Sequence, residues 1–355
     1  MHVFILFFSV KIQKNTVLAV LLLLLCTNSN RMDYLSLIKA PILTELEELQ
    51  QLFGNSLSSS NPLLNQVTAH IRRRTGKMMR PILVLLTAKL YGEITKTTHH
   101  AAVALELLHT ASLVHDDVVD ESDERRGQPS VNAVFNNKVA VLTGDYMLSS
   151  ALLQVALTEN FPIFNVVSRL GKDLADGELL QLSNVSNMQF SIDTYFEIIR
   201  KKTAVLFEAC TKSGALSVTN SDEKVEKARK LGEYIGLCFQ IKDDIFDYYD
   251  NAEIGKPTGN DMLEGKLTLP VLYALNVTQD EEAASIAMKV KNGAATVDEI
   301  ARLVKFTKEN GGIEYAVKTM NSFRERAHEL LKDEQDGEVK TALFAYLDYV
   351  IDRNK

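Results

Sequence analysis

Apolar residues recur every three to four positions along almost the whole chain after Met32, for example in AAVALELLHTASLVH and TYFEIIRKKTAVLFEACTKSGAL. This spacing places them on one face of an α-helix. Runs that alternate apolar and polar residues, which would indicate strands, do not occur, and no repeat or long linker divides the sequence. The pattern predicts one all-α domain over residues 32–355, with roughly ten or more helices.

The composition limits the classes of partner. With 46% hydrophobic residues the chain can bury a sizeable core, and its formal net charge of -7 gives no indication of a nucleic-acid partner. The three cysteines, Cys26, Cys210 and Cys238, have neither disulfide nor metal-ligand spacing. This cysteine usage predicts a reduced, cytoplasmic setting.

Residues 1–31 differ from the rest because they carry two apolar runs, VFILFFSV and VLAVLLLLLC, separated by polar residues. Neither run reaches the roughly 18 residues that a membrane-spanning helix needs. The second has the length of a signal-peptide apolar region, but no A-x-A cleavage site follows it. Three interpretations stay open: translation from Met32, a membrane anchor that would make the protein membrane-associated, and a cleaved targeting peptide.

Two aspartate clusters of identical spacing end two of the predicted helices. They are Asp116, Asp117 and Asp120 in HDDVVD, and Asp243, Asp244 and Asp247 in KDDIFD. A helical residue turns by about 100°, so the first and last aspartate of each cluster lie about 40° apart on one face. The helix dipole is negative at this end, so carboxylates there need a cation. Without further His or Cys ligands, hard oxygen donors favour Mg²⁺ that also binds substrate phosphates.

Basic residues accompany both clusters. They are Lys77 and Arg80 in GKMMRP, Arg125 and Arg126 after the first cluster, and Lys256 and Lys266 after the second. Lys and Arg are the usual phosphate ligands. His109 lies about 20° from Asp116 on the same helical face and is a further candidate. The sequence has no GxxxxGK[ST] and no GxGxxG, so a nucleotide is not the predicted substrate.

Five motifs in this order, GKMMRP, HTASLVHDDVVDESDERRG, KKTAVLF, FQIKDDIFDYY and GKPTGNDMLEGKLTLP, resemble the trans-isoprenyl diphosphate synthases (polyprenyl synthetases). The resemblance covers about Met32 to Lys355 and is greatest to medium- and long-chain polyprenyl (octaprenyl-like) diphosphate synthases. It implies the all-α isoprenoid synthase fold, a bundle of helices around a deep central cavity, and a homodimer. It also implies prenyl transfer from an allylic diphosphate, farnesyl or geranylgeranyl, to isopentenyl diphosphate. The product would partition into membranes, as quinone side-chain precursors do.

The resemblance also implies roles for single residues. The six aspartates Asp116, Asp117, Asp120, Asp243, Asp244 and Asp247 would bind roughly two or three Mg²⁺ ions on the allylic diphosphate. Arg125, Lys202 and Lys256 would support that diphosphate, and Thr203 and Gln240 would line the site near the reacting carbons. Lys266 is a further substrate-binding candidate. Lys77, Arg80, His109 and Arg126 would bind isopentenyl diphosphate.

Product length would depend on the helix that precedes Asp116. Ala111 and Ser112 lie about one turn before it, where short-chain members of the family carry a bulky aromatic residue. Both are small here, and the deeper Leu108 and Leu105 are not aromatic. One helical turn of about 5.4 Å corresponds to roughly one isoprene unit, so we expect a product of more than about four units, in the range of about six to ten.

Other classes of protein share part of this pattern. A terpene cyclase also carries DDxxD, but its second metal motif usually holds Asn, Ser and Glu. Head-to-head synthases lack GKxxRP. Two alternatives stay open within the family: a non-catalytic or regulatory subunit of a heteromeric synthase, and a short-chain farnesyl or geranylgeranyl synthase.

Overall fold

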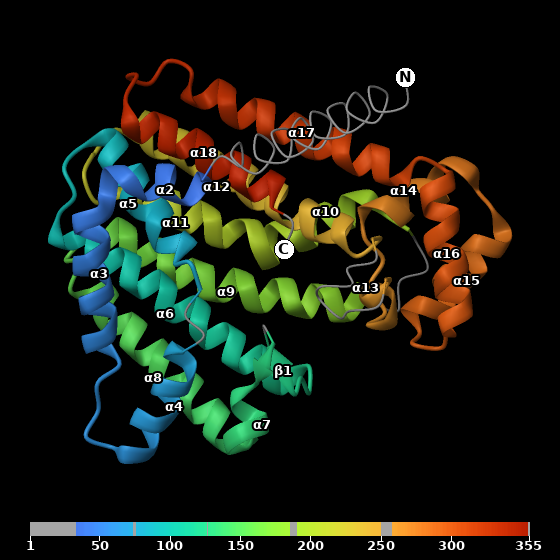
Figure 1. Ribbon diagram of the computed structural model, residues 1–355, viewed down its shortest axis with the longest axis horizontal. Helices are drawn as coiled ribbons and strands as arrows, with labels where there is room; N and C mark the ends of the chain where they lie inside the picture. Colours follow the sequence, from blue (N-terminus) through green and yellow to red (C-terminus); the bar gives the residue numbers. More distant parts are fainter. Residues whose placement is uncertain (1–32, 74–75, 126, 185–189, 250–257, 354–355) are drawn as a thin grey trace, which may run out of the picture.

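The computed structural model describes residues 33–73, 76–125, 127–184, 190–249 and 258–353, and these fold into an all-α bundle (Figure 1). Its elements are α2 (Tyr34–Lys39), η1 (Ala40–Ile42), α3 (Leu43–Ser56), α4 (Pro62–Arg72), α5 (Met79–Tyr91), α6 (Lys96–Val119), β1 (Glu124–Arg125), β2 (Gln128–Pro129), α7 (Val131–Phe135), α8 (Asn137–Ala156), α9 (Phe161–Asn184), α10 (Ile192–Ile199), η2 (Arg200–Ala204), α11 (Val205–Leu216), α12 (Asp222–Phe246), α13 (Asn260–Leu263), α14 (Leu269–Thr278), α15 (Glu281–Lys291), α16 (Val297–Glu309), α17 (Gly312–Leu331) and α18 (Glu338–Asp352). The prediction of an all-α fold with ten or more helices is confirmed.

Local sequence signals explain where several helices begin. Thr95 and Thr98 form a reciprocal capping box at the start of α6, and the Ser221 side chain accepts a hydrogen bond from the Lys224 N–H at the start of α12. Asn61 caps α4, whose first residue is Pro62, where the missing N–H costs nothing. The caps of α6 and α12 fix the beginnings of the two helices that carry the aspartate clusters at their far ends.

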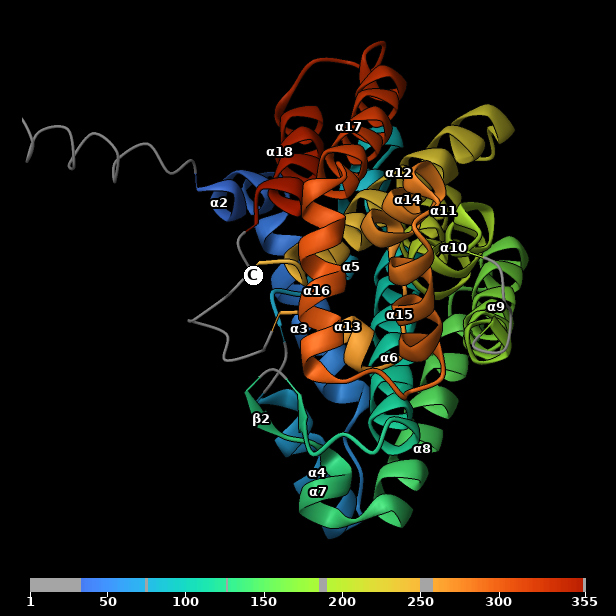
Figure 2. The same cartoon turned by 90° about the vertical axis from the view of Figure 1, so that its right-hand side faces the viewer.

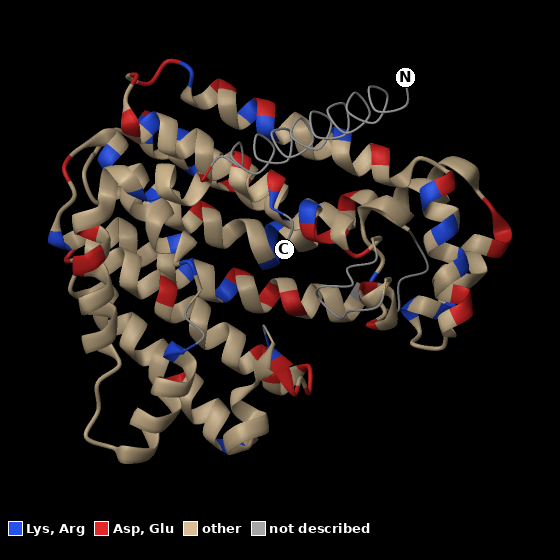
Figure 3. Ribbon diagram, in the orientation of Figure 1, with Lys and Arg blue, Asp and Glu red and all other residues tan. Residues whose placement is uncertain are grey.

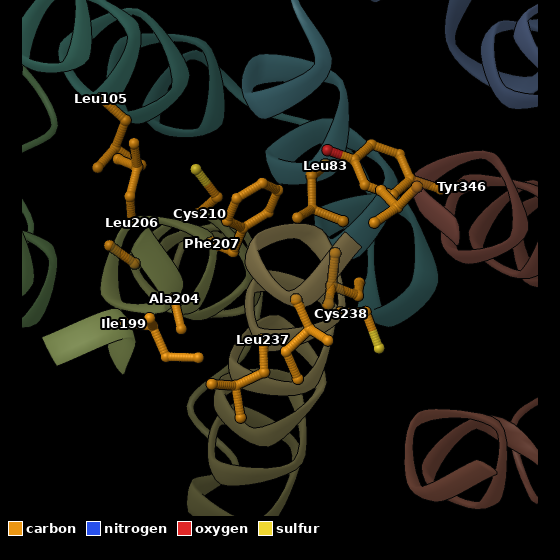
Figure 4. Close-up of a cluster of buried hydrophobic side chains, with 14 of the residues drawn as sticks. Leu83, Leu105, Ile199, Ala204, Leu206, Phe207, Cys210, Leu237, Cys238 and Tyr346 are labelled. Carbon is orange, nitrogen blue, oxygen red and sulfur yellow. The ribbon is translucent and has the colours of Figure 1, made fainter. Parts of the chain in front are cut away.

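The core lies where α6, α5, α11 and α12 meet. Helix α6 packs against α8, α5 and α11, and α12 packs against α11, α17 and α18. Figure 4 shows Leu83, Leu105 and Phe207 from three of these helices converging on one buried cluster, with Tyr346 of α18 at its edge. This packing holds α6 and α12 in fixed relation, and so positions both aspartate clusters.

The segment after the second cluster forms a smaller layer. Helices α15 and α16 lie side by side and both contact the short α13 (Figure 2). Helix α14 packs on α17 and connects this layer to α12. The layer therefore places α13 and the loop after it beside the end of α12.

Two features were not predicted. β1 and β2 pair antiparallel in the turn after α6, with Glu124 opposite Pro129 and Arg125 opposite Gln128. Two-residue strands are too short to produce a detectable alternation of apolar and polar residues. The second feature is η2, a π-helical turn between α10 and α11. Such turns are rare and often occur at functional sites.

Candidate active site

The first aspartate cluster lies at the end of α6, as predicted. Asp120 is the C-cap of this helix, and Asp117 is buried beneath it. Arg125 Nε donates a hydrogen bond to Asp117 Oδ1 at 2.5 Å, which brings two predicted site residues together. The Asn132 amide donates to the backbone oxygens of Asp117 and Ser122 and so holds the turn in place. Figure 3 shows the acidic residues gathered in this segment around β1.

The environment of Asp116 disfavours its ionised form. Burial, and next the Glu178 carboxylate, raise the pKa of Asp116 to about 6, although the Arg125 guanidinium and the Lys202 ammonium act in the opposite direction. Glu178 and Lys202 belong to α9 and η2, so Asp116 faces these elements across the site. A carboxyl group in this position favours a bound cation.

The second cluster ends α12, with Asp247 as its C-cap. Asp244 is only 2% exposed, and its two oxygens accept hydrogen bonds from Tyr195 Oη at 2.5 Å and Gln240 Nε2 at 2.8 Å. Burial, followed by the Asp261 carboxylate, raises the pKa of Asp244 well above its ordinary value. Asp243 Oδ1 accepts a hydrogen bond from Arg353 Nη2 at 2.6 Å.

Asp261 is a site residue that the motif-by-motif reasoning missed. Its backbone N–H donates to Asp247 Oδ2 at 3.2 Å, and burial and the Asp247 carboxylate raise the pKa of Asp261 to about 7. The signal was present, because Asp261 is the only aspartate in GKPTGNDMLEGKLTLP. The second cluster thus comprises a fourth aspartate, contributed by α13.

The π-helical turn η2 presents Lys202 and Thr203. Lys202 Nζ lies 2.5 Å from Glu178 Oε2 and donates to Gln181 Oε1 at 2.9 Å. Thr203 Oγ1 donates to Gln240 Oε1 at 2.7 Å. The extra residue of a π turn changes which side chains point the same way, and here it directs these two into the site.

A cavity of about 300 Å³ opens between η2, α12 and the loop after α13. Its polar lining includes Lys202, Thr203, Gln240, Asp244, Asp261 and Lys266. Although burial disfavours the charge of Lys266, the carboxylates of Glu264, Asp261 and Asp120 raise its pKa. Asp120 therefore acts on this loop from the end of α6, and the two clusters face each other.

A second cavity, of about 470 Å³, lies on the other side of the α6 end. Its charged lining comprises Lys77, Arg80, Glu106, His109, Asp117, Arg125 and Arg353. Lys77 Nζ donates to Tyr349 Oη at 2.6 Å, and the Arg80 guanidinium lies 5.4 Å from the centre of the Phe207 ring. Lys77, Arg80 and His109 were predicted to bind isopentenyl diphosphate, and the structure brings these three residues together in one cavity.

Arg353 belongs to this cavity but was not predicted. Its guanidinium lies 3.9 Å from the centre of the Phe239 ring and also donates a hydrogen bond to Asp243. A single arginine after the last helix gives no local pattern, so no sequence signal could have found it. Two predicted residues, Arg126 and Lys256, lie outside the described part of the chain, as do residues 1–31.

The predicted ligands are close but are not arranged as a finished metal site. Among the described residues, no three Asp, Glu, His or Cys side chains converge closely enough to hold a metal ion. Instead, carboxylate oxygens of Asp117, Asp243 and Asp244 accept hydrogen bonds from Arg125, Arg353 and Tyr195.

The chain-length candidates Ala111, Ser112 and Leu108 lie on α6 before Asp116, and the Ser112 hydroxyl donates to the backbone oxygen of His109.

Comparison with known proteins agrees with this geometry. The family model described as "Polyprenyl synthetase" matches residues 61–307. The chain is 35% identical to the "All-trans-nonaprenyl-diphosphate synthase (geranyl-diphosphate specific)" of Rhodobacter capsulatus over 323 residues, 90% of this chain and 98% of the relative. It is 33% identical to the octaprenyl diphosphate synthase of Haemophilus influenzae over 313 residues, 87% of this chain and 94% of the relative.

A solved structure supports the same assignment. It is named geranylgeranyl pyrophosphate synthase from Bacteroides thetaiotaomicron, with 58% sequence identity and a TM-score of 0.80, and the match covers 91% of this chain and all of the other. The predicted isoprenoid synthase fold and the predicted prenyltransferase class are thereby confirmed. With its two facing aspartate clusters and two cation-lined cavities, the chain belongs to the polyprenyl synthetase family.

Proposed function

We propose that this chain is a Mg²⁺-dependent trans-polyprenyl diphosphate synthase that adds isopentenyl units successively to an allylic diphosphate. The observation that carries the proposal is the pair of cation-lined cavities on either side of the α6 end. One diphosphate would bind in each cavity, and the substrates would meet beside Asp116 and Asp117. A single-substrate enzyme of similar fold has no need for two such cavities.

The described residues fit the metal. Carboxylate oxygens are the ligands that Mg²⁺ prefers, and Asp116, Asp244 and Asp261 all have raised pKa values. A raised carboxyl pKa means that the surroundings disfavour the ionised form, and a bound divalent cation would stabilise that form. Asp116, Asp117 and Asp120 would bind the metal from one side, and Asp243, Asp244 and Asp247 from the other. Bound Mg²⁺ would neutralise the diphosphate as it leaves.

The chain's own residues would divide the remaining work between the cavities. Lys202 and Lys266, with Arg125 and Lys256, would stabilise the charge that develops on the allylic diphosphate as its C–O bond breaks. Lys77, Arg80 and His109, with Arg126, would bind the second diphosphate. They would thus hold the isopentenyl double bond near the allylic cation, where the new C–C bond forms before a proton is lost.

For product length, we propose more than about four isoprene units, because small Ala111 and Ser112 leave room along α6 where an aromatic side chain would close it. The names of relatives support two outcomes. Two name octaprenyl and nonaprenyl products, whereas the 58% identical structure is named for geranylgeranyl diphosphate. From the resemblance of the motifs we also propose a farnesyl or geranylgeranyl primer. The compartment that we propose from the cysteine usage is the cytoplasm.

We further propose that a second copy of the chain covers α8 and the start of α9. Leu142, Leu153 and Leu157 are largely exposed there, and the exposed rings of Phe161 and Phe164 stack with centres 6.2 Å apart. Within the described residues, α8 is the one helix whose length and composition would suit a membrane span, yet 44% of that window is buried in the bundle. An apolar patch of this extent favours a protein interface.

The dimer can be tested by sedimentation. Leu153→Glu should convert the dimer into monomers, whereas the equally exposed Val297→Glu on α16 should not. A wild-type protein that is monomeric at micromolar concentration would contradict this part of the proposal.

The catalytic proposal is tested with the purified chain alone, radiolabelled isopentenyl diphosphate, farnesyl diphosphate and Mg²⁺. We expect release of diphosphate and incorporation of label, and loss of both when EDTA is added. Activity that appears only with a second, different protein would instead support the interpretation as a subunit of a heteromeric synthase.

A further inference from the structure

Four side chains form a continuous hydrogen-bonded series from α10 to the cavity beside η2. Tyr195 Oη donates to Asp244 Oδ2 at 2.5 Å, and Gln240 Nε2 donates to Asp244 Oδ1 at 2.8 Å. Thr203 Oγ1 then lies 2.7 Å from Gln240 Oε1. Tyr195 is buried and packs edge-on against Phe196, so its position is fixed.

The chemistry of the groups fixes the direction of every proton in the series. With the proposed metal bound, Asp244 is an ionised carboxylate that only accepts hydrogen bonds, so the NH₂ group of Gln240 must face Asp244 and its oxygen must face Thr203. That oxygen in turn only accepts, so the single proton of the Thr203 hydroxyl points to Gln240. The lone pairs of Thr203 Oγ1 are then left for the cavity, which Thr203 lines.

We propose that Tyr195 is a positioning residue of the prenyl transfer reaction: by holding Asp244, it orients Gln240 and Thr203 so that an oxygen dipole faces the allylic cation. An oxygen whose lone pairs are already turned toward the site stabilises positive charge without reorientation. The inference rests on the proposed function. Asp244 can still contribute to metal binding, because a carboxylate has about four lone-pair positions.

Two ligands separate this role from a structural one. Farnesyl thiolodiphosphate is an unreactive analogue with an uncharged chain, and its 3-aza ammonium analogue carries positive charge where the allylic cation develops. Their binding is measured by calorimetry with Mg²⁺ present. We expect Tyr195→Phe to weaken the ammonium analogue by about ten-fold and the thiolodiphosphate by less than about two-fold.

Matched variants test the series from both ends. Tyr248→Phe is the control, because Tyr248 is a fully buried tyrosine beside the same cluster, and it does not belong to the hydrogen-bonded series. It should change neither affinity. Gln240→Leu removes the hydrogen bond between Gln240 and Asp244, and it should also weaken the ammonium analogue selectively. The double variant Tyr195→Phe/Gln240→Leu should bind this analogue only slightly more weakly than either single variant. Gln240→Leu carries the test alone should Tyr195→Phe not fold.

Equal weakening of both analogues in Tyr195→Phe, or weakening of neither, would overturn the inference and leave the proposed function intact. A wild-type protein that binds neither analogue with Mg²⁺ would overturn the proposed function and the inference together.

Discussion

Replacing Asp261 by asparagine should stabilise the metal-free protein. The folded pKa of Asp261 is about 7, raised from 3.8 by burial and by the Asp247 carboxylate. A raised carboxyl pKa means that ionisation opposes folding, so the penalty is absent below about pH 4, grows with pH and is complete above about pH 7. Each pKa unit corresponds to about 1.36 kcal/mol, so a shift of about 3 units gives about 4 kcal/mol.

The neighbouring aspartates share this penalty, so we expect Asp261→Asn to recover about half, or about 2 kcal/mol, in the free energy of unfolding at pH 8. Urea denaturation in EDTA measures this gain in the free energy of unfolding. Asp333→Asn, at an exposed position, is the control. The gain should fall to less than about half its value at pH 5. Added Mg²⁺ should stabilise the wild type more than the variant. A variant no more stable than the wild type at pH 8, or a gain independent of pH, would refute the reasoning.

Three further predictions concern activity. Asp116→Ala or Asp243→Ala should lower turnover by about 10³-fold or more, with circular dichroism unchanged, because the carboxylates serve charge rather than packing; near-normal turnover would refute the metal assignment. Ser112→Phe or Ala111→Tyr should shorten the product to about three or four isoprene units while the first condensation survives, and chromatography showing an unchanged length would exclude a path along α6. Deletion of residues 1–31 should leave solubility and turnover intact; loss of either would indicate a structural role.

The helices and the aspartate clusters could be predicted because their signals are local. Asp116 and Asp120 lie on one helical face by spacing alone, and the same argument applies to Asp243 and Asp247. Both clusters occur where this reasoning placed them, at the ends of α6 and α12.

The rest of the candidate site depends on contacts between distant parts of the chain. Arg353 reaches Asp243 across 110 positions, and Tyr195 reaches Asp244 across 49. No periodicity or spacing records such contacts. The direction of Lys202 is set by the π turn η2, which regular helical spacing does not reveal.

The most direct test of the central proposal is the size of the product that the wild-type chain makes alone. The purified protein is supplied with farnesyl diphosphate, excess labelled isopentenyl diphosphate and Mg²⁺, and the hydrolysed lipids are separated by chromatography. We predict all-trans alcohols of more than about four isoprene units, centred at about six to ten. A product that stops at about four units would contradict the proposed path of the tail past Ala111 and Ser112, and the absence of any labelled lipid would contradict the proposed synthase itself.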